Sequence, residues 1–233
     1  MTAQPSPFEY CGTELVLFEK AANWKGYWRE QIASYVGGHV LEVGAGIGAN
    51  TKSLASLPHT RWTSLNPDAA LASQIQEVSK LHSTLTKTIG GLPAMDRFDT
   101  ILYIDVLEHI ERDAQEMQDA AARLKPGGHL IVLAPAHPFL FTPFDAAIGH
   151  FRRYTRASLR AVVPRNLTAV RIAYLDCAGM LASGANRMLL KSAMPSERQI
   201  LTWDRWLIPV SRWLDPVFRW RIGKSVIGIW RQD

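Results

Sequence analysis

Three alternate glycines, Gly44, Gly46 and Gly48, stand between an apolar run at residues 39–43 and a stretch of helical character from residue 50. Glycine permits positive φ and lacks the Cβ atom that would hold a ligand away from the backbone. The unpaired N–H groups at the start of the following helix favour an anionic group. The spacing therefore predicts a strand, a tight turn and a helix that together bring the main chain close to a small ligand.

Two classes of ligand fit this turn. The pattern Gly44-x-Gly46-x-x-Ala49 matches the dinucleotide fingerprint with Ala in its last place, which indicates a nicotinamide- or flavin-binding protein. Glu42 favours a different ligand, because a carboxylate at the buried end of a strand is costly unless it meets a cationic or hydrogen-bonding group. S-adenosylmethionine offers both an ammonium and a sulfonium group to such an acid. On the turn alone, both classes stay open.

Alternating apolar and polar segments supply the elements that must position this turn. Apolar runs predict seven strands, over residues 39–43, 61–65, 84–89, 98–104, 129–134, 168–175 and 226–230. Helices are expected over residues 50–57, 68–81, 112–124 and 157–163. This alternation predicts an α/β fold with a doubly wound, Rossmann-like sheet, parallel through its first five strands, and with ligands beyond the carboxyl ends of the strands.

The whole chain, residues 1–233, is expected to form one domain with three parts. One or two helices over residues 14–35 make residues 1–36 an N-terminal helical segment. Residues 37–175 form the expected cofactor-binding core. Residues 176–233 hold C-terminal helices and the last strand.

The C-terminal part is basic and rich in tryptophan. Residues 150–233 carry 15 Lys and Arg against 5 Asp and Glu, whereas residues 1–149 carry 11 against 16. A capping box at Ser196 starts a helical stretch in which aromatic residues alternate with arginine, and Pro209 and Pro216 predict interruptions of it. Such a stretch is typical of a segment that packs on the sheet or forms a homodimer contact. A peripheral membrane contact that gives access to lipid-like substrates is the alternative. Nucleic acid is disfavoured as a partner, because the basic residues form no run and no recognised binding module is present.

The glycine turn and the acid before it resemble motif I of the class I S-adenosylmethionine-dependent methyltransferases, and four further segments extend the resemblance. Residues 98–110, which end in Leu-Glu-His-Ile, are similar to the fourth-strand segment of this family. Residues 124–130 look like its entry to the fifth strand. Residues 149–155 and 223–226 resemble segments of a bacterial subgroup, the methyltransferase type 11/12-like proteins. The motifs keep their order and spacing over nearly the whole chain from about Phe18 onward.

The resemblance implies which residues hold the cofactor. Gly44, Gly46 and Gly48 would pass under its methionine moiety, and Glu42 would orient its amino group directly or through water. The other implied contacts are Asn66 and Pro67 at the ribose, Gly90, Gly91 and Leu92 at the adenine edge, and Asp105 and Val106 near the methionine end.

Ribose recognition departs from the family pattern. Where the family commonly has an acid that bonds the ribose hydroxyls, this chain has Asn66, which lacks the charge-assisted bond of a carboxylate. Asp68, two residues further on, could supply the missing carboxylate bond to the ribose. The missing acid also counts against a nicotinamide site, which requires the same carboxylate.

The long loop between residues 135 and 154 holds the candidate catalytic residues. Methyl transfer from a sulfonium is an in-line displacement, so positioning and exclusion of water should supply much of the rate, and a base is needed for an acceptor hydroxyl of high pKa. His137 is the first candidate for that base and His150 the second. Glu108 and His109 are interpreted as a brace for the helix behind the sheet. The expected substrate contacts are Arg152 and Arg153, which could clamp a carboxylate or phosphate, and Tyr154, which could line the same pocket.

Composition limits the classes of protein to which the chain could belong. The chain has 233 residues, of which 47% are hydrophobic and 20% charged, a balance that indicates a globular fold and excludes disorder of its bulk. Cys11 and Cys177 form neither a close-spaced pair nor a Cys/His cluster, so no metal site is expected. No apolar run reaches the roughly 18 residues of a membrane span, and residues 1–5 lack the basic start of a secretory leader. A cytoplasmic location is therefore expected.

These features together predict an enzyme. The expected reaction is S-adenosylmethionine-dependent methyl transfer to a small-molecule or lipid-like acceptor. A nicotinamide-dependent oxidoreductase and a non-catalytic S-adenosylmethionine-binding module are the alternatives.

Overall fold

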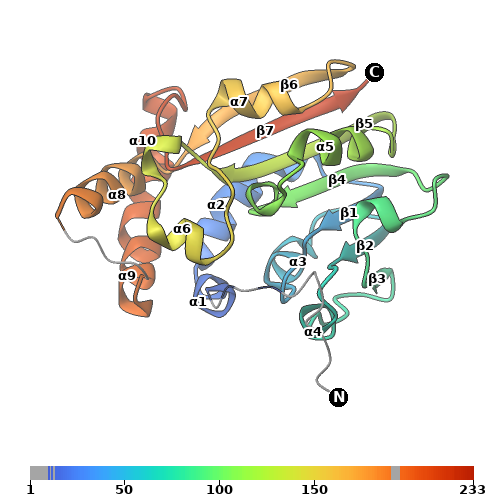
Figure 1. Ribbon diagram of the computed structural model, residues 1–233, viewed down its shortest axis with the longest axis horizontal. Coiled ribbons are helices and arrows are strands. Elements are labelled where there is room, and N and C mark those ends of the chain that lie inside the picture. Colours follow the sequence, from blue (N-terminus) through green and yellow to red (C-terminus); the bar gives the residue numbers. More distant parts are fainter. Residues whose placement is uncertain (1–9, 11, 13, 190–194) are drawn as a thin grey trace.

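The computed structural model describes Tyr10, Gly12 and residues 14–189 and 195–233. Seven strands form one sheet in the order β3-β2-β1-β4-β5-β7-β6 (Figure 1). The strands are β1 His39–Val43, β2 Arg61–Leu65, β3 His82–Leu85, β4 Phe98–Ile104, β5 Leu124–Pro135, β6 Leu167–Leu175 and β7 Ser225–Gln232. Neighbouring strands from β1 to β5 are parallel, whereas β7 runs antiparallel between β5 and β6. The predicted seven-stranded α/β sheet is confirmed.

Helices pack on both faces of the sheet. On one face, Met117 and Leu159 form a core with Tyr103 of β4. On the other face, Trp28 and Ile208 form a core with strand residues that include Trp62 of β2. The helices are α1 Leu15–Glu19, α2 Ala22–Ile32, α3 Ala49–Leu54, α4 Ala69–Ala72, α5 Asp113–Ala121, α6 Pro143–Ala147, α7 Arg156–Val162, α8 Cys177–Leu189, α9 Glu197–Thr202 and α10 Ile208–Val217, and a π-helical turn at Trp203–Leu207 joins α9 to α10. This cover on both faces, from α5 and α7 on one and α2 and α10 on the other, makes the fold doubly wound, as predicted.

The alternation of side chains along β1 places Glu42 on the face covered by α2. Val40 belongs to the core that contains Trp28, whereas Leu41 and Val43 belong to the opposite core. Because successive side chains of a strand point to opposite faces, Glu42 shares the face of Val40. β1 also lies beside β4, where the strand order reverses, and open α/β sheets bind their ligands at this switch point.

Two buried aspartates attach the C-terminal helices to the rest of the chain. Asp204, in the π-helical turn, accepts hydrogen bonds from the backbone N–H groups of Asn23 and Trp24 at 3.1 and 2.8 Å, at the start of α2. Asp215, in α10, accepts a hydrogen bond from the Tyr27 hydroxyl at 2.7 Å. The Asp215 carboxylate also accepts from two backbone N–H groups at the start of α8, at 2.7 and 3.0 Å. These bonds fix α8, α9 and α10 beside α2.

The predicted helix over residues 68–81 is too long, because α4 ends at Ala72. Beyond α4 the chain places Ile75 against the glycine turn, where a Cβ atom added to Gly48 would lie 3.2 Å from Ile75 Cγ2. This packing overrides the helical pattern of the segment.

Two further bounds differ for reasons of strand pairing. The bounds of the strand predicted over residues 84–89 are wrong. β3 is an edge strand that pairs with β2, and it ends at Leu85, where β2 also ends. Residue 89 instead begins a 3-10 turn, Ile89–Gly91. β5 begins earlier than predicted, since Leu124 already pairs with Phe98 of β4.

The predicted interruption at Pro209 corresponds to the π-helical turn Trp203–Leu207, which lies just before this proline and breaks the α-helical pattern between α9 and α10. Pro216 does not interrupt the helix, because it lies in the last turn of α10. None of the described helices is both long and apolar enough to cross a bilayer. Of the two cysteines, Cys177 is a buried free thiol and Cys11 lies outside the described residues.

Replacing Asp215 by Ala should lower the free energy of unfolding by about 3 kcal/mol, because the Tyr27 hydroxyl and two backbone N–H groups lose their buried acceptor. Equilibrium unfolding in urea, followed by tryptophan fluorescence, measures this change. The exposed Arg219→Ala variant serves as the control and should stay within about 0.5 kcal/mol of the parent. Equal stability of the parent and the Asp215→Ala variant would show that this carboxylate does not anchor the C-terminal helices.

Candidate active site

A cavity of about 1160 Å³ lies beyond the carboxyl ends of β1, β4 and β5, at the point where the strand order reverses. The glycine turn after β1, Asp105 after β4 and Pro135 at the end of β5 line its sheet side. Residues of α1, α2, α6 and α9 line the remaining walls. The cavity therefore joins the predicted cofactor turn to a chamber built by the N-terminal and C-terminal helices.

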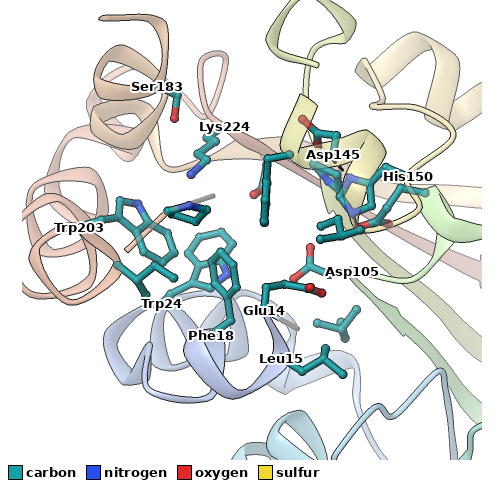
Figure 2. Close-up of a pocket in the computed structure, with 18 of the residues that line it drawn as sticks. Glu14, Leu15, Phe18, Trp24, Asp105, Asp145, His150, Ser183, Trp203 and Lys224 are labelled. Carbon is teal, nitrogen blue, oxygen red and sulfur yellow. Dashed lines mark hydrogen bonds and ion pairs between the residues drawn. The ribbon is translucent and has the colours of Figure 1, made fainter. Parts of the chain in front are cut away.

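The walls of this cavity differ in character. Figure 2 shows Phe18, Trp24 and Trp203 on one side, and Asp145 and His150 on the other. The aromatic residues come from α1, α2 and the π-helical turn, and the charged pair comes from α6 and the loop after it. A ligand in the cavity would have an apolar face and a polar face within reach.

The three glycines of the turn have different roles, although all three have positive φ, of 68°, 57° and 81° in order. A Cβ atom on Gly44 would lie 2.6 Å from Val106 Cγ2, and one on Gly48 would press on Ile75. Gly44 and Gly48 are therefore required by packing within the protein. A Cβ atom on Gly46 would meet only Leu15 methyl groups, at 3.7 Å, so Gly46 is the glycine that leaves room for a ligand in the cavity.

Glu42 is buried directly before the turn, and its two oxygens have different surroundings. Oε2 accepts hydrogen bonds from the Thr51 hydroxyl at 2.6 Å, the Trp62 indole N–H at 3.0 Å and the Ser64 hydroxyl at 3.3 Å. Oε1 is buried and has no hydrogen-bond partner among the described residues. Burial raises the pKa of Glu42 to about 7, although these three hydrogen bonds act in the opposite direction. The unpaired oxygen leaves a place for one more donor.

The residues expected at the ribose are used within the protein. Asn66 donates from Nδ2 to the Gly46 carbonyl oxygen at 3.0 Å and so supports the glycine turn. Asp68 accepts from the Tyr10 backbone N–H at 2.9 Å and caps α4. The hydrogen bond from Tyr10 is the main cause that holds the pKa of Asp68 below its ordinary value. Neither these two residues nor Pro67 lines the cavity.

The expected adenine contacts also lie outside this cavity. Gly90 and Gly91 belong to the 3-10 turn after β3, and Leu92 is part of the core on the α5 face. Val106 packs against Gly44, whereas Asp105 lines the cavity. Of the implied contacts, the cavity brings together Gly44, Gly46 and Asp105, whereas Glu42 and Gly48 do not line it.

Two carboxyl groups after β4 give the cavity an acidic floor. Asp105 is exposed to the cavity but enclosed by its walls, and this enclosure raises the pKa of Asp105 to about 6. Glu108 is buried, and burial together with the nearby charge of Asp105 raises its pKa well above the usual value. Glu108 Oε2 has no hydrogen-bond partner among the described residues. The structure therefore places Glu108 at the cavity, in addition to the bracing position expected for it.

His150, the second predicted catalytic residue, lines the cavity. Its Nδ1 lies 2.9 Å from Asp145 Oδ1, and its Nε2 lies 3.8 Å from Glu108 Oε1. Arg153 donates from Nε and Nη2 to the two oxygens of Asp145, at 2.8 and 3.0 Å. Burial acts to raise the pKa of Asp145, but the hydrogen bonds from His150 and Arg153 outweigh it and hold that pKa well below its ordinary value. Asp145 is thus an ionised partner that orients the His150 ring.

The remaining predicted residues of the loop point elsewhere. His137 does not line the cavity: its ring lies between those of Phe139 and Tyr174, at 5.1 and 4.6 Å between centroids. Arg152 forms an ion pair with Asp113 at 2.6 Å. The Tyr154 hydroxyl donates to the same carboxylate at 2.8 Å. Arg153 is the one predicted substrate contact that lines the cavity, and its guanidinium group is occupied by Asp145.

Several cavity residues were not predicted from the sequence. Asp145 precedes His150 by five residues, and the Asp-x-x-x-x-His spacing on either side of a helix end could have indicated the pair. Lys224, in the segment 223–226, lies with Nζ 5.1 Å from the centre of the Trp203 ring. Burial lowers the pKa of Lys224. The aromatic residues Phe18 and Trp24 also line the cavity, and no local pattern distinguishes a core aromatic from one that lines a cavity.

Glu108, His109 and His150 form the set of described residues best placed to hold a metal ion. Each offers one ligand atom, and these atoms lie within 4.8 Å of one another. Burial is the main cause that lowers the pKa of His109 to about 4, which keeps its ring neutral. Carboxylate and neutral imidazole are ligands of transition metals. His150 and Glu108 also lie close to each other without a metal, so their proximity alone does not indicate a bound ion. The expectation of no metal site stays a prediction.

Residues 22–169 match the model of a protein family described as a methyltransferase domain. The chain belongs to this family. The methyltransferase is 34% identical over 161 residues to a demethylmenaquinone methyltransferase of Tropheryma whipplei, and the match covers 67% of this chain and 63% of the relative. It is 29% identical over 104 residues to a mitochondrial ubiquinone biosynthesis O-methyltransferase of Candida albicans, over 40% of this chain and 31% of that relative. The matches thus span less than two thirds of the length of these relatives.

A solved structure has the same fold. The methyltransferase matches the N-methyltransferase NodS of Bradyrhizobium japonicum, crystallised with S-adenosyl-L-homocysteine, with a TM-score of 0.59 over 92% of this chain and 87% of that one. The two chains are 16% identical, so the likeness concerns the fold. With the family match, it confirms the predicted class I, S-adenosylmethionine-dependent methyltransferase.

The residues present fit S-adenosylmethionine. Gly46 keeps the turn free of a side chain where the cavity meets it. The buried, unpaired Oε1 of Glu42 matches an ammonium donor, and the acidic floor at Asp105 matches a sulfonium charge. A nicotinamide dinucleotide has less support, because Asn66 and Asp68 are both occupied and no free acid stands at the end of β2.

Replacing Gly46 by Val should weaken S-adenosylmethionine binding at least about 100-fold, because a branched side chain would fill the approach space. Isothermal titration calorimetry measures the affinity. Gly127→Val is the matched control: Gly127 has φ 77° and no atom within 4 Å of an added Cβ, so this variant carries the same backbone strain far from the cavity. Near-normal affinity in the Gly46→Val variant would contradict the position assigned to the cofactor.

Stability of the ligand-free methyltransferase should decrease as pH rises from about 4.5 to about 7. Glu42 holds its proton more tightly in the folded chain, where its pKa is about 7, than at the ordinary value of 4.5 in the unfolded chain. Glu42→Gln removes this titration and should be more stable than the parent above pH 7, by up to about 3 kcal/mol. Urea unfolding at both ends of this range tests the effect, with the exposed Glu77→Gln as control. A Glu42→Gln variant that loses stability at high pH would refute the raised pKa.

Proposed function

We propose that the methyltransferase acts on an apolar, ring-bearing or lipid-like small molecule that gives up a proton as it is methylated. The observation that carries this proposal is the presence, in one cavity, of an aromatic wall and of the His150–Asp145 pair. The aromatic wall supports the choice of acceptor, and the pair supports the proton transfer.

The aromatic wall favours an apolar ring over a charged acceptor. The ring centroid of Trp203 lies 5.8 Å from that of Trp24 and 6.3 Å from that of Phe18, so these three side chains form a continuous surface. Aromatic faces of this kind stack on a planar ligand, and the Lys224 ammonium group, 5.1 Å from the centre of the Trp203 ring, disfavours a second cation at this wall. The cavity volume of about 1160 Å³ also exceeds what a small amine or amino acid would fill.

Polar groups at the edge of this wall could fix the orientation of such a ring. Lys224 reaches the cavity beside Trp203 and can donate a hydrogen bond to a ring oxygen. Its lowered pKa reflects the limited solvent around it, which strengthens such a bond. On the opposite side, His150 is within the same cavity.

His150 is the residue that can take the proton. The Asp145 carboxylate is ionised and can only accept, so Nδ1 of His150 carries the hydrogen and Nε2 is left as the acceptor. When Nε2 gains a proton, the ring becomes cationic between Asp145 and Glu108, whose Oε1 lies 3.8 Å from Nε2. Arg153 and Thr142 hold Asp145 in place and so act as positioning residues.

The cofactor supplies a methyl group on a positively charged sulfur. The chain provides the glycine turn that admits the cofactor, the Asp105 carboxyl group that faces its positive charge in the cavity, and walls that enclose the reacting atoms. Either a ring hydroxyl or a ring carbon releases one proton on methylation, so the same base serves both kinds of acceptor.

The Tropheryma whipplei relative gives the first acceptor to assay. The substrate in the name of that relative, a demethylmenaquinone, is an apolar ring compound that suits the aromatic wall. Purified methyltransferase, labelled S-adenosylmethionine and reduced demethylmenaquinone should yield a labelled apolar product, detected by mass spectrometry. A polar amine of similar ring size, assayed in parallel, should remain unlabelled. Label in the amine alone would overturn the proposed acceptor class.

His150→Asn should lower kcat about 100- to 10,000-fold, because the variant lacks the imidazole that the ionised Asp145 orients in the cavity. S-adenosylmethionine affinity should change little, since His150 does not contact the glycine turn. His137→Asn is the matched control: asparagine tolerates the positive φ of 64° at this position, and His137 lies outside the cavity. Comparable losses of kcat in both variants, or a loss in His137→Asn alone, would refute the assignment of the base to His150.

A further inference from the structure

An apolar stripe runs along the outer surface of the C-terminal helices. It consists of Leu201, Trp206, Val210, Trp213, Val217 and Phe218, and we call it the tryptophan face. Trp206 is 63% exposed, Trp213 75% and Val217 66%. The spacing of 206, 210, 213 and 217 places these side chains on one side of the helix. Large apolar side chains in such a row on a surface indicate a contact with something outside the chain.

The same helices present positive charge around the tryptophan face. Five exposed arginines lie in this segment, at positions 198, 205, 212, 219 and 221, and one of them, Arg212, pairs with Glu30 of α2. Its acids do not balance them at the surface: Asp204 and Asp215 are buried and serve the starts of α2 and α8, and Glu197 pairs with Lys20. Inward-pointing carboxylates thus leave the outer surface apolar and cationic.

We propose that the tryptophan face docks on an anionic lipid bilayer. Tryptophan rings prefer the boundary between hydrocarbon and water, where the ring is buried and the indole N–H stays hydrated. Arginines beside them meet lipid phosphates, and an amphipathic segment of this composition lies in the plane of the membrane surface. A second copy of the chain fits the face less well, because a two-fold contact would bring two cationic surfaces together.

A shallow groove at the edge of the tryptophan face fits a lipid headgroup. It has a volume of about 460 Å³ and is lined by Arg198, Leu201, Thr202, Arg205, Trp206 and Glu197, whose carboxylate pairs with Lys20. The Arg205 guanidinium lies 5.4 Å from the centre of the Trp206 ring. Two guanidinium groups next to an apolar floor match a phosphate with an attached acyl chain.

The docking surface adjoins the active-site cavity. Arg198 and Thr202 of α9 line both the groove and the cavity, so one helix separates the membrane-facing surface from the acceptor chamber. An apolar acceptor dissolved in the bilayer would then reach the cavity without crossing water. This last step rests on the proposed function, whereas the docking itself does not.

Flotation with vesicles tests the docking. The parent should float with vesicles of equal parts phosphatidylcholine and phosphatidylglycerol, and much less with phosphatidylcholine alone. The double variant Trp206→Ala/Trp213→Ala should bind the anionic vesicles at least about tenfold more weakly. Leu81→Ala/Met95→Ala is the control, because both side chains are exposed and apolar but lie near β3 and β4, and it should bind like the parent.

Three results would overturn the docking proposal. They are failure of the parent to float, equal binding by the Trp206→Ala/Trp213→Ala variant, and a parent dimer in solution that this variant dissociates. The methyl-transfer assay with acceptor in detergent micelles separates the two proposals. Flotation without methyl transfer would leave the docking intact and refute the proposed function, and methyl transfer by a parent that does not float would do the reverse.

Discussion

The contact between Gly44 and Val106 sets how closely the turn after β1 approaches the chain after β4. A Cβ atom on Gly44 would stand 2.6 Å from Val106, a separation that real Cβ contacts do not reach, so only glycine permits it. Everything at the active site is arranged around this approach. Asp105 precedes Val106 directly, Gly46 follows Gly44 by two residues, and the cavity begins where the two segments meet. The elements that complete the cavity come from both ends of the chain and are held there by Asp204 and Asp215.

Three carboxyl groups at or near the cavity differ in how far the protein compensates their negative charge. Asp145 is neutralised within the protein by Arg153. Asp105 faces the cavity, and its raised pKa shows that the chain alone does not stabilise its charge fully. Glu42, directly before the turn, keeps one oxygen without a partner among the described residues. Carboxyl groups that a fold leaves uncompensated suit a ligand that brings positive charge.

The sequence was sufficient for those features that neighbouring residues determine. β1, β2 and β4 have the predicted bounds because turn residues directly follow each of these strands. α4 and β3 do not, since packing of Ile75 on Gly48 and the end of β2 decide where they stop. The same distinction holds at the site. His150 could be selected from the sequence as a loop histidine. Its contact with Asp145, and the position of His137 outside the cavity, depend on how the loop folds back on the sheet. Glu42 was identified correctly as a buried acid, whereas its hydrogen bonds to β2 and α3 required the fold.

The position of β7 affects how the chain can be built during translation. β7 lies between β5 and β6 and pairs with both, although it follows all other strands in the sequence. A nascent chain that has emerged only as far as α10 holds β6 with no neighbour in the sheet, and Lys224 has not yet reached the cavity. The first five strands can assemble in order as they leave the ribosome, but the cavity is complete only after the antiparallel strand β7 has been synthesised. Until then the exposed edges of β5 and β6 are surfaces on which chaperones would act.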